Sequence, residues 1–328
     1  MDCLHGIIAN LFTTFNEDGS LDDTGQCNFI DALLATGCVD TYFVRSGMGQ
    51  MYALRLDEVK QIIRTACTHL DGKAPVLAGT SGIWNRDRSN LPDRATYTRE
   101  AIELSQYAAE QGATAVVLTI PEGLAPTETE TPFDVTRRYL ESVCAAIQTP
   151  IVLYQPPSTA PDYQVTAETI KEISEFPNVK GIKVSTTDGR YILDICWATR
   201  NKDFCFIVGD EGAYYPGLCC GATAIIGQGA CMYPAILQAV RKRFAAGDYE
   251  GAIDAQRSVN ILRETRRCSN PVAFTKRYFA EQGYAMTTVR RSEGPGSEYV
   301  PTIPSLDSTT YESYKQLLES ELARYVSQ

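Results

Sequence analysis

Histidine is scarce in this sequence. The 328 residues include only two, His5 and His69, and neither stands at the end of an expected strand. A Ser–His–Asp triad needs a histidine as its base, and zinc sites commonly use several histidines or cysteines. The 11 cysteines contain no C-x-x-C pair, so a zinc or thioredoxin-like motif has no support. We therefore expect a protein that works without a metal.

The sequence also lacks an excess of basic residues and long apolar runs. The chain has 30 Lys and Arg against 40 Asp and Glu, which gives a net charge of -10 and argues against a nucleic-acid surface. No apolar run is long enough to cross a bilayer, and the first residues do not resemble a signal peptide. The cysteines are scattered, mostly in apolar segments, which favours a reduced cytoplasmic protein with buried thiols.

The chain does contain a regular alternation of strand-like and helix-like segments. The expected strands are 6–12, 40–44, 75–78, 114–120, 150–154, 178–185, 204–208 and 222–226. The expected helices that follow them are 22–36, 56–70, 93–111, 133–147, 165–176, 190–199, 214–219 and 234–245. Eight such units predict an α/β fold, a (β/α)8 TIM barrel, whose typical length is about 250 residues. An open doubly wound sheet is the alternative, but no G-x-G-x-x-G follows the first strand, which argues against it. We expect no cofactor.

The remainder of the chain is expected to be helical. We predict two domains, the barrel with the active site over 1–246 and a C-terminal helical domain over 247–328. The helices of the second domain are expected at 249–266, 271–283 and 309–327. Residues 287–307 are rich in Gly, Pro, Ser and charge, which indicates an extended loop. Its adjacent Arg290 and Arg291 suit a small anion site or, more simply, a solvated surface pair.

The strand 178–185 carries a lysine near its end. Side chains alternate along a strand, so Lys183 is expected to share a face with Gly181 and Val179. The other face takes Lys180, Ile182 and Val184. Gly181 would leave space beside the amine, and desolvation there favours the neutral form, which can attack a ketone and form a Schiff base. For this strand alone, a lysine that packs its stem and extends its ammonium into water is the simpler interpretation.

Tyr154 shifts that balance, because it ends the preceding strand and a phenol can move protons to and from a carbinolamine. In a TIM barrel the chemistry lies at the C-terminal ends of the strands. There the turn 46–49 offers backbone N–H groups that can hold a carboxylate, although it also suits a purely structural turn. Asp210 and Glu211 suit either acid–base work or the N-cap of the next helix.

Taken together, these segments resemble the dihydrodipicolinate synthase / N-acetylneuraminate lyase family of class I aldolases. The matching pieces are Gly6 to Thr13, Ser46 to Gln50 with Leu54 and Glu58, Ala78 to Thr80, Tyr154 to Pro157, Asn178 to Lys183, Gly209-Asp210 and Gly221 to Gly229. The resemblance implies a barrel with a helical C-terminal domain, usually a homotetramer. It also implies a Schiff base between Lys183 and pyruvate or a related 2-oxo acid, with Tyr154 moving the protons. The candidate substrate-binding residues are Ser46, Gly47, Met48, Thr80, Glu122, Gly209 and Ile226.

The sequence departs from the family pattern where substrates bind. Gly47-Met48 stands where two hydroxyl side chains usually hold the pyruvate carboxylate and relay protons, and Gln50 stands where glutamate is usual. Backbone N–H groups of the turn, or the side chains of Arg45, Ser46 or Thr80, would have to replace those hydroxyls. Gly123 and Thr159 stand where dihydrodipicolinate synthases carry a tyrosine and a substrate-binding arginine. These losses argue against aspartate semialdehyde as the acceptor.

Three interpretations remain at this point. The first is an aldolase that makes or cleaves a 2-oxo-3-deoxy (sugar) acid through Lys183, with Glu122 facing a hydroxyl-rich or cationic acceptor. The second is a dihydrodipicolinate synthase or a hydratase-type enzyme that uses the same Schiff base. The third is a catalytically impaired barrel that serves in binding or assembly. Lys183 and Tyr154 argue against the third, because a site without chemistry has no need of that pair.

Overall fold

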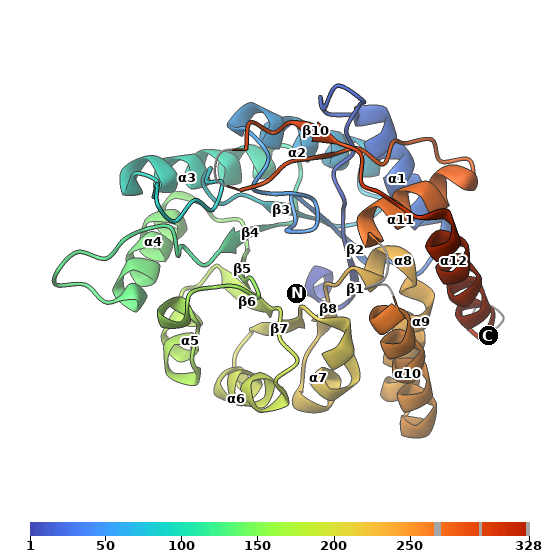
Figure 1. Ribbon diagram of the computed structural model, residues 1–328. Coiled ribbons are helices and arrows are strands. Elements are labelled where there is room, and N and C mark those ends of the chain that lie inside the picture. Colours follow the sequence, from blue (N-terminus) through green and yellow to red (C-terminus); the bar gives the residue numbers. More distant parts are fainter. Residues whose placement is uncertain (266–269, 295–296, 326–328) are drawn as a thin grey trace.

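The structure is a computed structural model that describes residues 1–265, 270–294 and 297–325. Eight parallel strands close into a barrel in chain order, with β8 beside β1 (Figure 1). The strands are β1 (Gly6–Asn10), β2 (Thr41–Val44), β3 (Val76–Gly79), β4 (Ala115–Thr119), β5 (Ile151–Gln155), β6 (Val179–Val184), β7 (Cys205–Val208) and β8 (Ala224–Ile225). The expected TIM barrel is confirmed.

Helices surround this barrel and follow the predicted units. They are α1 (Asp23–Ala35), α2 (Leu56–Leu70), α3 (Arg94–Glu110), α4 (Pro132–Ala146), α5 (Ala167–Ile173), α6 (Gly189–Thr199), α7 (Tyr214–Cys220) and α9 (Pro234–Ala245). The short helix α8 (Gly229–Met232) and the 3-10 turns η1 (Asp2–Leu4), η2 (Pro161–Tyr163) and η3 (Glu211–Ala213) were not expected. Elements of one turn are too short to show a hydrophobic period.

Local capping explains where several helices begin. The side chain of Asp22 accepts a hydrogen bond from the Gly25 N–H at the start of α1, and Thr131 accepts one from Asp134 at the start of α4. Asp210 caps η3 by accepting from the Gly212 N–H, so the capping interpretation of Asp210 is confirmed. Such caps satisfy N–H groups that lack a partner within the helix.

The apolar core has two layers. The strand residues that point outward pack with the helices, whereas a smaller cluster fills the barrel interior. That inner cluster contains Ile8, Phe43, Leu77, Ala115, Val117, Val152, Tyr154, Cys205, Ile207, Ala224 and Ile226, and Cys3 and Leu4 from η1 join it. The barrel is therefore a packed core rather than a pore.

A bulge in β6 changes the face that we expected for Val179. Along β5, Ile151 pairs with Val179 but Val152 pairs with Gly181, so Lys180 is an extra residue. Val179 consequently packs in the outer layer with Ile182 and Val184 rather than on the face of Lys183. The expected space beside Gly181 is also wrong, since a Cβ there would lie 2.6 Å from the carbonyl oxygen of Cys205. Glycine at this position allows β7 to approach closely.

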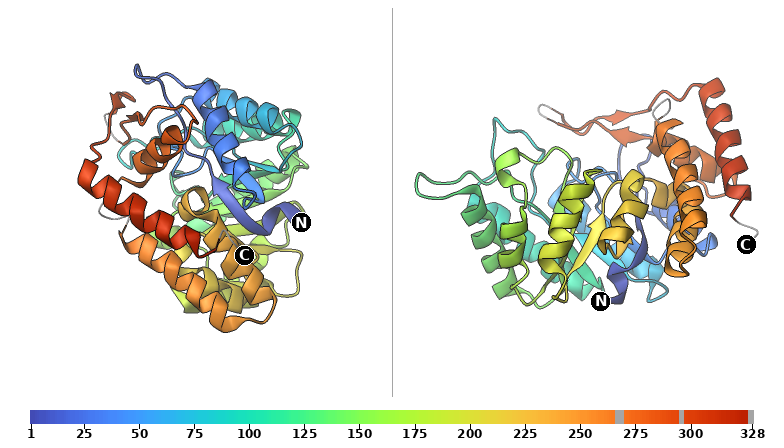
Figure 2. Two further views of the ribbon diagram at one scale, coloured as in Figure 1. Left: turned by 90° about the vertical axis from the view of Figure 1, so that its right-hand side faces the viewer. Right: turned by 90° about the horizontal axis from the view of Figure 1, so that it is seen from below.

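The C-terminal helices are α10 (Tyr249–Thr265), α11 (Pro271–Glu281) and α12 (Ser308–Ala323). Figure 2 shows them gathered on one side of the barrel. The ends predicted for two of these helices, at 266 and at 326–327, lie outside the described residues, and so does Cys268. The division into domains 1–246 and 247–328 stays a prediction. Over the described parts of the chain, no helix is long and apolar enough to cross a membrane.

The segment expected as an extended loop contains a short antiparallel ribbon of β9 (Arg290–Arg291) and β10 (Pro301–Thr302). This ribbon packs against the barrel through Arg291. The Arg291 side chain is buried, and its guanidinium lies 2.6 Å from the Glu58 carboxylate in α2. The Gln50 amide donates to the Arg291 carbonyl at 2.6 Å and accepts from the Arg291 N–H at 3.1 Å. Arg291 is therefore neither a solvated surface residue nor free to bind an anion. The reciprocal pair also needs an amide at position 50, since a carboxylate cannot donate.

Another buried cation holds the C-terminal part against β1. The Lys276 ammonium donates to the carbonyl oxygens of Thr13 and Val289 at 2.7 and 3.1 Å. Burial lowers the pKa of Lys276 from its ordinary value of 10.5 to about 7. This contact is therefore made by a lysine whose charge depends on pH near neutrality.

We expect Lys276 to make stability rise with pH above neutrality. Between pH 7 and 10.5 the unfolded chain binds more protons at this residue than the folded chain does. The free energy of unfolding therefore increases as pH rises through this window. Below pH 7 the folded protein bears the full cost of burying the charged Lys276 ammonium. Urea unfolding of the unaltered protein and of Lys276→Met from about pH 7 to 8, below the usual thiol range, should show a smaller increase in the variant. Parallel pH profiles would contradict the assignment.

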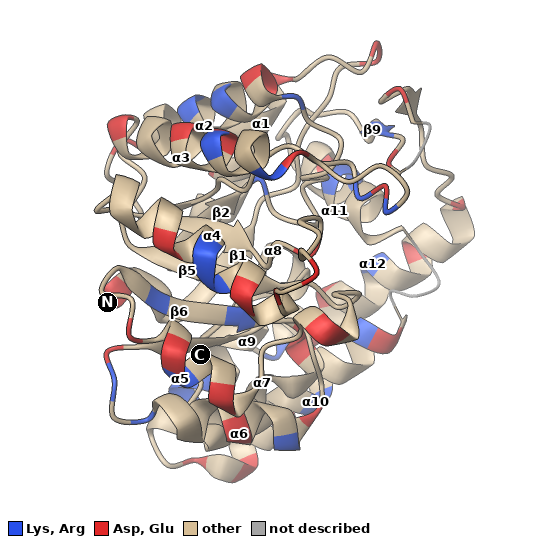
Figure 3. Cartoon of the chain, turned by 90° about the vertical axis from the view of Figure 1, so that its left-hand side faces the viewer, with Lys and Arg blue, Asp and Glu red and all other residues tan. Residues whose placement is uncertain are grey.

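Figure 3 shows Lys and Arg positions interspersed with Asp and Glu positions along the helices in that view. Ten cysteines are free thiols in the described residues, and of these Cys219 alone is exposed.

Candidate active site

A cavity of about 340 Å³ opens at the C-terminal ends of the strands. The residues that line it come from seven of the eight strand ends or the loops that follow them. They are Asn10, Gly47, Met48, Tyr52, Arg86, Tyr154, Pro156, Pro157, Lys183, Ser185, Gly209, Asp210, Glu211, Ile226, Gly227 and Gln228. Six of the predicted site residues are among them, namely Lys183, Tyr154, Gly47, Met48, Gly209 and Ile226.

Lys183 and Tyr154 lie side by side in this cavity. They are paired across β5 and β6, and the Lys183 Nζ lies 3.9 Å from the centre of the Tyr154 ring. Each residue is only 5% exposed. In the described parts of the chain, no protein group forms a hydrogen bond with the Lys183 amine or the Tyr154 hydroxyl. An amine and a phenol that are enclosed together in this way can act on one carbonyl compound.

The turn after β2 presents two open backbone donors to the same cavity. Among the described residues, the N–H groups of Gly47 and Met48 donate to no protein acceptor. Ser46 instead shapes the turn, since its hydroxyl donates to the Leu11 carbonyl and accepts from the Gly49 N–H. Adjacent N–H groups of this kind form a nest for an anion. The turn thus offers backbone donors in place of the hydroxyl side chains.

A methyl group at position 47 should impair the reaction and leave the fold intact. A Cβ built on Gly47 would lie 3.1 Å from the Tyr154 hydroxyl, so the phenol would have to shift. Small displacements of a catalytic group can cost about 10²-fold in rate. We expect kcat of Gly47→Ala to fall by roughly 10-fold or more, with little change in urea midpoint. An unchanged kcat would show that the phenol position is not critical.

Glu122, Thr80 and Ser46 do not line the cavity, contrary to the prediction. The Glu122 side chain is 3% exposed, and its carboxylate accepts from Arg86, Arg88 and the Ala160 N–H. It therefore has no oxygen open to a hydroxyl-rich or cationic acceptor. The Thr80 hydroxyl accepts from Ser105 in α3, on the outer side of the barrel.

Arg45 does not supply the missing carboxylate contact either. It is buried, and its guanidinium donates to the carbonyls of Ser81 and Gly79 at 2.5 and 3.4 Å. Burial lowers the pKa of Arg45 to about 10. These contacts tie the β2 end to the β3 end, outside the main cavity.

Two acids stand on the β7 side of the cavity. Asp210 forms an ion pair of 2.6 Å with Arg263 in α10 in addition to its cap. Glu211 is buried, and its carboxylate accepts from the Gly229 N–H at 2.7 Å. These partners hold both carboxylates in place.

Sequence reasoning missed Asn10, Tyr52 and Arg86 in the lining and assigned no role to Ser185 or Gln228, which stand near strand ends. Asn10, Ser185 and Gln228 add neutral hydrogen-bonding groups, and Arg86 adds a cation from the loop between β3 and α3. Asn10 ends a strand, which is the signal that would have found it. Arg86 lies seven residues beyond the end of β3, and only the fold brings it to this site.

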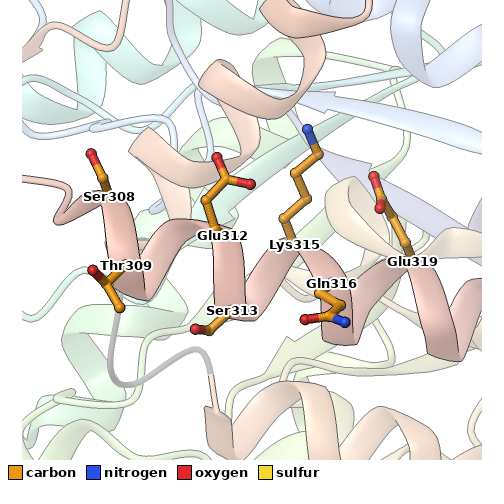
Figure 4. A pocket seen from close by; sticks show the side chains of 7 residues that line it. All are labelled: Ser308, Thr309, Glu312, Ser313, Lys315, Gln316 and Glu319. Carbon is orange, nitrogen blue, oxygen red and sulfur yellow. The ribbon is translucent and has the colours of Figure 1, made fainter.

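A second hollow of about 580 Å³ lies along α12 and is shallow and polar (Figure 4). Its lining comes from one exposed helix face, including Glu312, Lys315 and Glu319, and offers no enclosed reactive pair. In the described ranges, no three His, Cys, Asp or Glu residues gather in a way that could hold a metal ion. The barrel cavity is thus the candidate active site.

Known proteins resemble this chain over nearly its full length. A profile of the Dihydrodipicolinate synthetase family matches residues 3–298. The 4-hydroxy-tetrahydrodipicolinate synthase of Dechloromonas aromatica is 27% identical over 269 residues, covering 81% of this chain and 85% of that enzyme. The enzyme of the same name from Bartonella bacilliformis is 25% identical and covers 97% of both chains.

Solved structures of proteins from the same family have the same fold as this chain. YagE, a prophage protein of the dihydrodipicolinic acid synthase family from E. coli K12 in complex with pyruvate, superposes with a TM-score of 0.79 at 25% identity, covering 97% of this chain and 98% of that one. N-acetylneuraminate lyase from Mycoplasma synoviae shares the fold, with a TM-score of 0.77 at 19% identity and 99% of both chains covered. The chain therefore belongs to the dihydrodipicolinate synthetase family, the class I pyruvate-dependent aldolases.

Proposed function

We propose that this aldolase makes or cleaves a 2-oxo-3-deoxy sugar acid, with pyruvate as one product or substrate. The observation that carries the proposal is the enclosed Lys183–Tyr154 pair in a cavity whose lining includes several neutral hydrogen-bonding groups. Asn10, Ser185 and Gln228 suit the hydroxyls of such a substrate. The pyruvate complex of the related YagE supports pyruvate as the common fragment.

In this reaction the Lys183 amine attacks C2 of the 2-oxo acid, and water leaves to give an iminium. The N–H groups of Gly47 and Met48 hold the C1 carboxylate. Tyr154 gives its proton to the hydroxyl that leaves C2 and becomes a phenolate. This phenolate takes the proton of the C4 hydroxyl while the C3–C4 bond breaks and its electrons pass to the iminium, which releases an aldehyde and leaves an enamine. Protonation at C3 and hydrolysis then give pyruvate and restore the amine.

Aspartate semialdehyde fits this chain less well than the relatives that use it. Thr159 stands in place of the arginine, and its hydroxyl donates to the Pro156 carbonyl. Gly123 stands in place of a tyrosine, and the Trp84 ring packs there, since a Cβ on Gly123 would lie 2.8 Å from it. No side chain can therefore be added at position 123 without moving Trp84.

The test combines trapping with a substrate screen. Incubation with pyruvate and borohydride should label the peptide that contains Lys183. A pyruvate-release assay over several 2-oxo-3-deoxy sugar acids should then show turnover, with condensation of pyruvate and aspartate semialdehyde as the competing assay. Efficient condensation with aspartate semialdehyde would overturn the sugar-acid assignment, and no label at Lys183 would overturn the covalent mechanism.

We further propose a cytoplasmic homo-oligomer, a tetramer or a dimer. The family resemblance motivates this, and one surface feature supports it. Leu193 and Trp197 are 49% and 63% exposed and lie one turn apart on α6. Exposed apolar side chains on one helix face are typical of contact surfaces. That the protein works without a metal stays a prediction.

A further inference from the structure

Arg86 reaches the cavity from an unusual backbone position. It lies in the loop between β3 and α3 with φ of 65°, in the left-handed region that non-glycine residues seldom occupy. Such a conformation persists only where surrounding contacts hold it. Here the Arg86 guanidinium lies 5.4 Å from the centre of the Tyr52 ring, and both residues line the cavity.

The contacts of Arg86 leave part of its guanidinium open. Its Nε and Nη2 donate to one oxygen of Glu122 at 3.1 and 2.5 Å. Its Nη1 and Nη2 donate to the hydroxyl and the carbonyl of Ser158 at 2.6 and 3.1 Å. A guanidinium has five N–H groups, so one N–H on Nη1 has no acceptor in the described residues. The Ser158 hydroxyl, which accepts from Arg86, still has its own proton to donate.

The charged side chains in contact with Glu122 carry a net positive charge together with it. Glu122 is shared by Arg86 and Arg88, so two cations face one carboxylate. The acids that line the cavity, Asp210 and Glu211, stand across it after β7, where Asp210 is paired with Arg263. The cluster of Arg86, Arg88 and Glu122 therefore has one positive charge in excess, whereas the acids that line the cavity stand on the β7 side.

We propose that Arg86 binds an acidic group at the far end of the substrate, so that this enzyme prefers 2-oxo-3-deoxy acids that end in an anion. The proposal rests on the sugar-acid aldolase function above and narrows its substrate class. Ser158 holds Arg86 through its hydroxyl and its carbonyl. The cation is thus supplied to the cavity from the loop after β3, and Glu122 orients it.

The experiment compares substrates that differ only at the far end. A 2-oxo-3-deoxy acid ending in a hydroxymethyl group is compared with the acid of equal length ending in a carboxylate, and with the phosphate ester of the first. Hydrogen bonds to a charged group are typically worth roughly 10- to 100-fold. We expect kcat/KM for one of the two anionic substrates to exceed that of the hydroxymethyl substrate by about this factor. Which anion is favoured separates a carboxylate from a phosphate.

Variants of Arg86 and Arg88 test whether the preference for an anionic substrate depends on Arg86. In Arg86→Met, kcat/KM should fall more for the anionic substrate than for the hydroxymethyl substrate, so that the preference is lost. Arg86→Lys should retain part of the preference, because the charge stays but the planar fork is lost. Arg88→Met is the matched control. Arg88 contacts the same Glu122 and the same Ser158 carbonyl but does not line the cavity, so the preference should persist.

Borohydride trapping of pyruvate on every protein separates this proposal from the function on which it rests. Normal trapping with equal turnover of all three substrates, or a preference for the hydroxymethyl end, would overturn the role of Arg86 and leave the aldolase intact. An equal loss for all substrates in Arg86→Met would reduce Arg86 to a loop support and also overturn it. Absent trapping in the unaltered enzyme would refute the proposed function itself. The substrate preference of the unaltered enzyme decides the matter even if a variant does not fold.

Discussion

Lys183→Met should abolish turnover, with kcat reduced by roughly 10⁴-fold or more, as is usual when a covalent nucleophile is removed. The thioether has nearly the length of the amine but cannot form an imine. Since Lys183 is 5% exposed and makes no hydrogen bond in the described chain, its loss leaves no buried partner unsatisfied. We therefore expect the urea midpoint to stay the same or to rise.

Two measurements complete this test. Single-turnover pyruvate release gives the rate, and borohydride reduction with peptide mapping should find the label lost from the segment containing Lys183. Lys180→Met is the matched control, because Lys180 lies on the same strand but forms an ion pair of 2.7 Å with Asp203 on the surface. A label that survives in Lys183→Met would place the imine on another lysine.

Tyr154→Phe should lower kcat by roughly 10²- to 10⁴-fold, the range typical of a general acid–base group. Phenylalanine keeps the ring that lies 3.9 Å from the Lys183 Nζ and removes only the hydroxyl. The stability should change little, since that hydroxyl has no protein partner among the described residues. Imine trapping should become slower but persist, because the amine itself is unaltered.

The competing proton path uses a carboxylate. Glu122 is excluded from this role by its saturated contacts, which leaves Asp210 and Glu211 as the acids that line the cavity. Asp210 is paired with Arg263, so Glu211 is the acid to compare. Glu211→Gln keeps the acceptor for the Gly229 N–H and removes the basic oxygen. If Tyr154→Phe turns over at nearly the normal rate while Glu211→Gln is inactive, the proton path does not run through the phenol. Pre-steady-state kinetics with both variants make the comparison.

The sequence was sufficient for the barrel because its signals are local. Strand and helix periods, caps such as Asp22 and stops such as Gly37 act over a few residues, and eight repeats of one unit leave little choice of topology. The pairing of Tyr154 and Lys183 also followed, since both end neighbouring strands of a parallel sheet. Positions at strand ends are thus predictable once the fold is known.

Side-chain direction beyond the strand ends was not predictable. Glu122 follows a strand, yet its carboxylate turns away from the cavity because Arg86 and Arg88 come from another loop to meet it. Arg291 resembled a surface residue by composition, whereas its burial depends on Glu58, 233 residues earlier in the chain. The face of Val179 depended on a bulge that alternation alone does not indicate. Each of these features depends on contacts between distant segments.

The two hydrogen bonds between the Gln50 amide and the Arg291 backbone have a consequence for engineering this enzyme. The backbone donors of Gly47 and Met48 are linked to the C-terminal ribbon, because the same short turn also carries Gln50, whose amide forms two hydrogen bonds with the Arg291 backbone. Grafting the turn from a relative with glutamate at this position would place a carboxylate against the Arg291 carbonyl. A chimaera that exchanges substrate loops should therefore transplant residues 46–50 together with the segment around Arg291, although the two are some 240 positions apart in the chain.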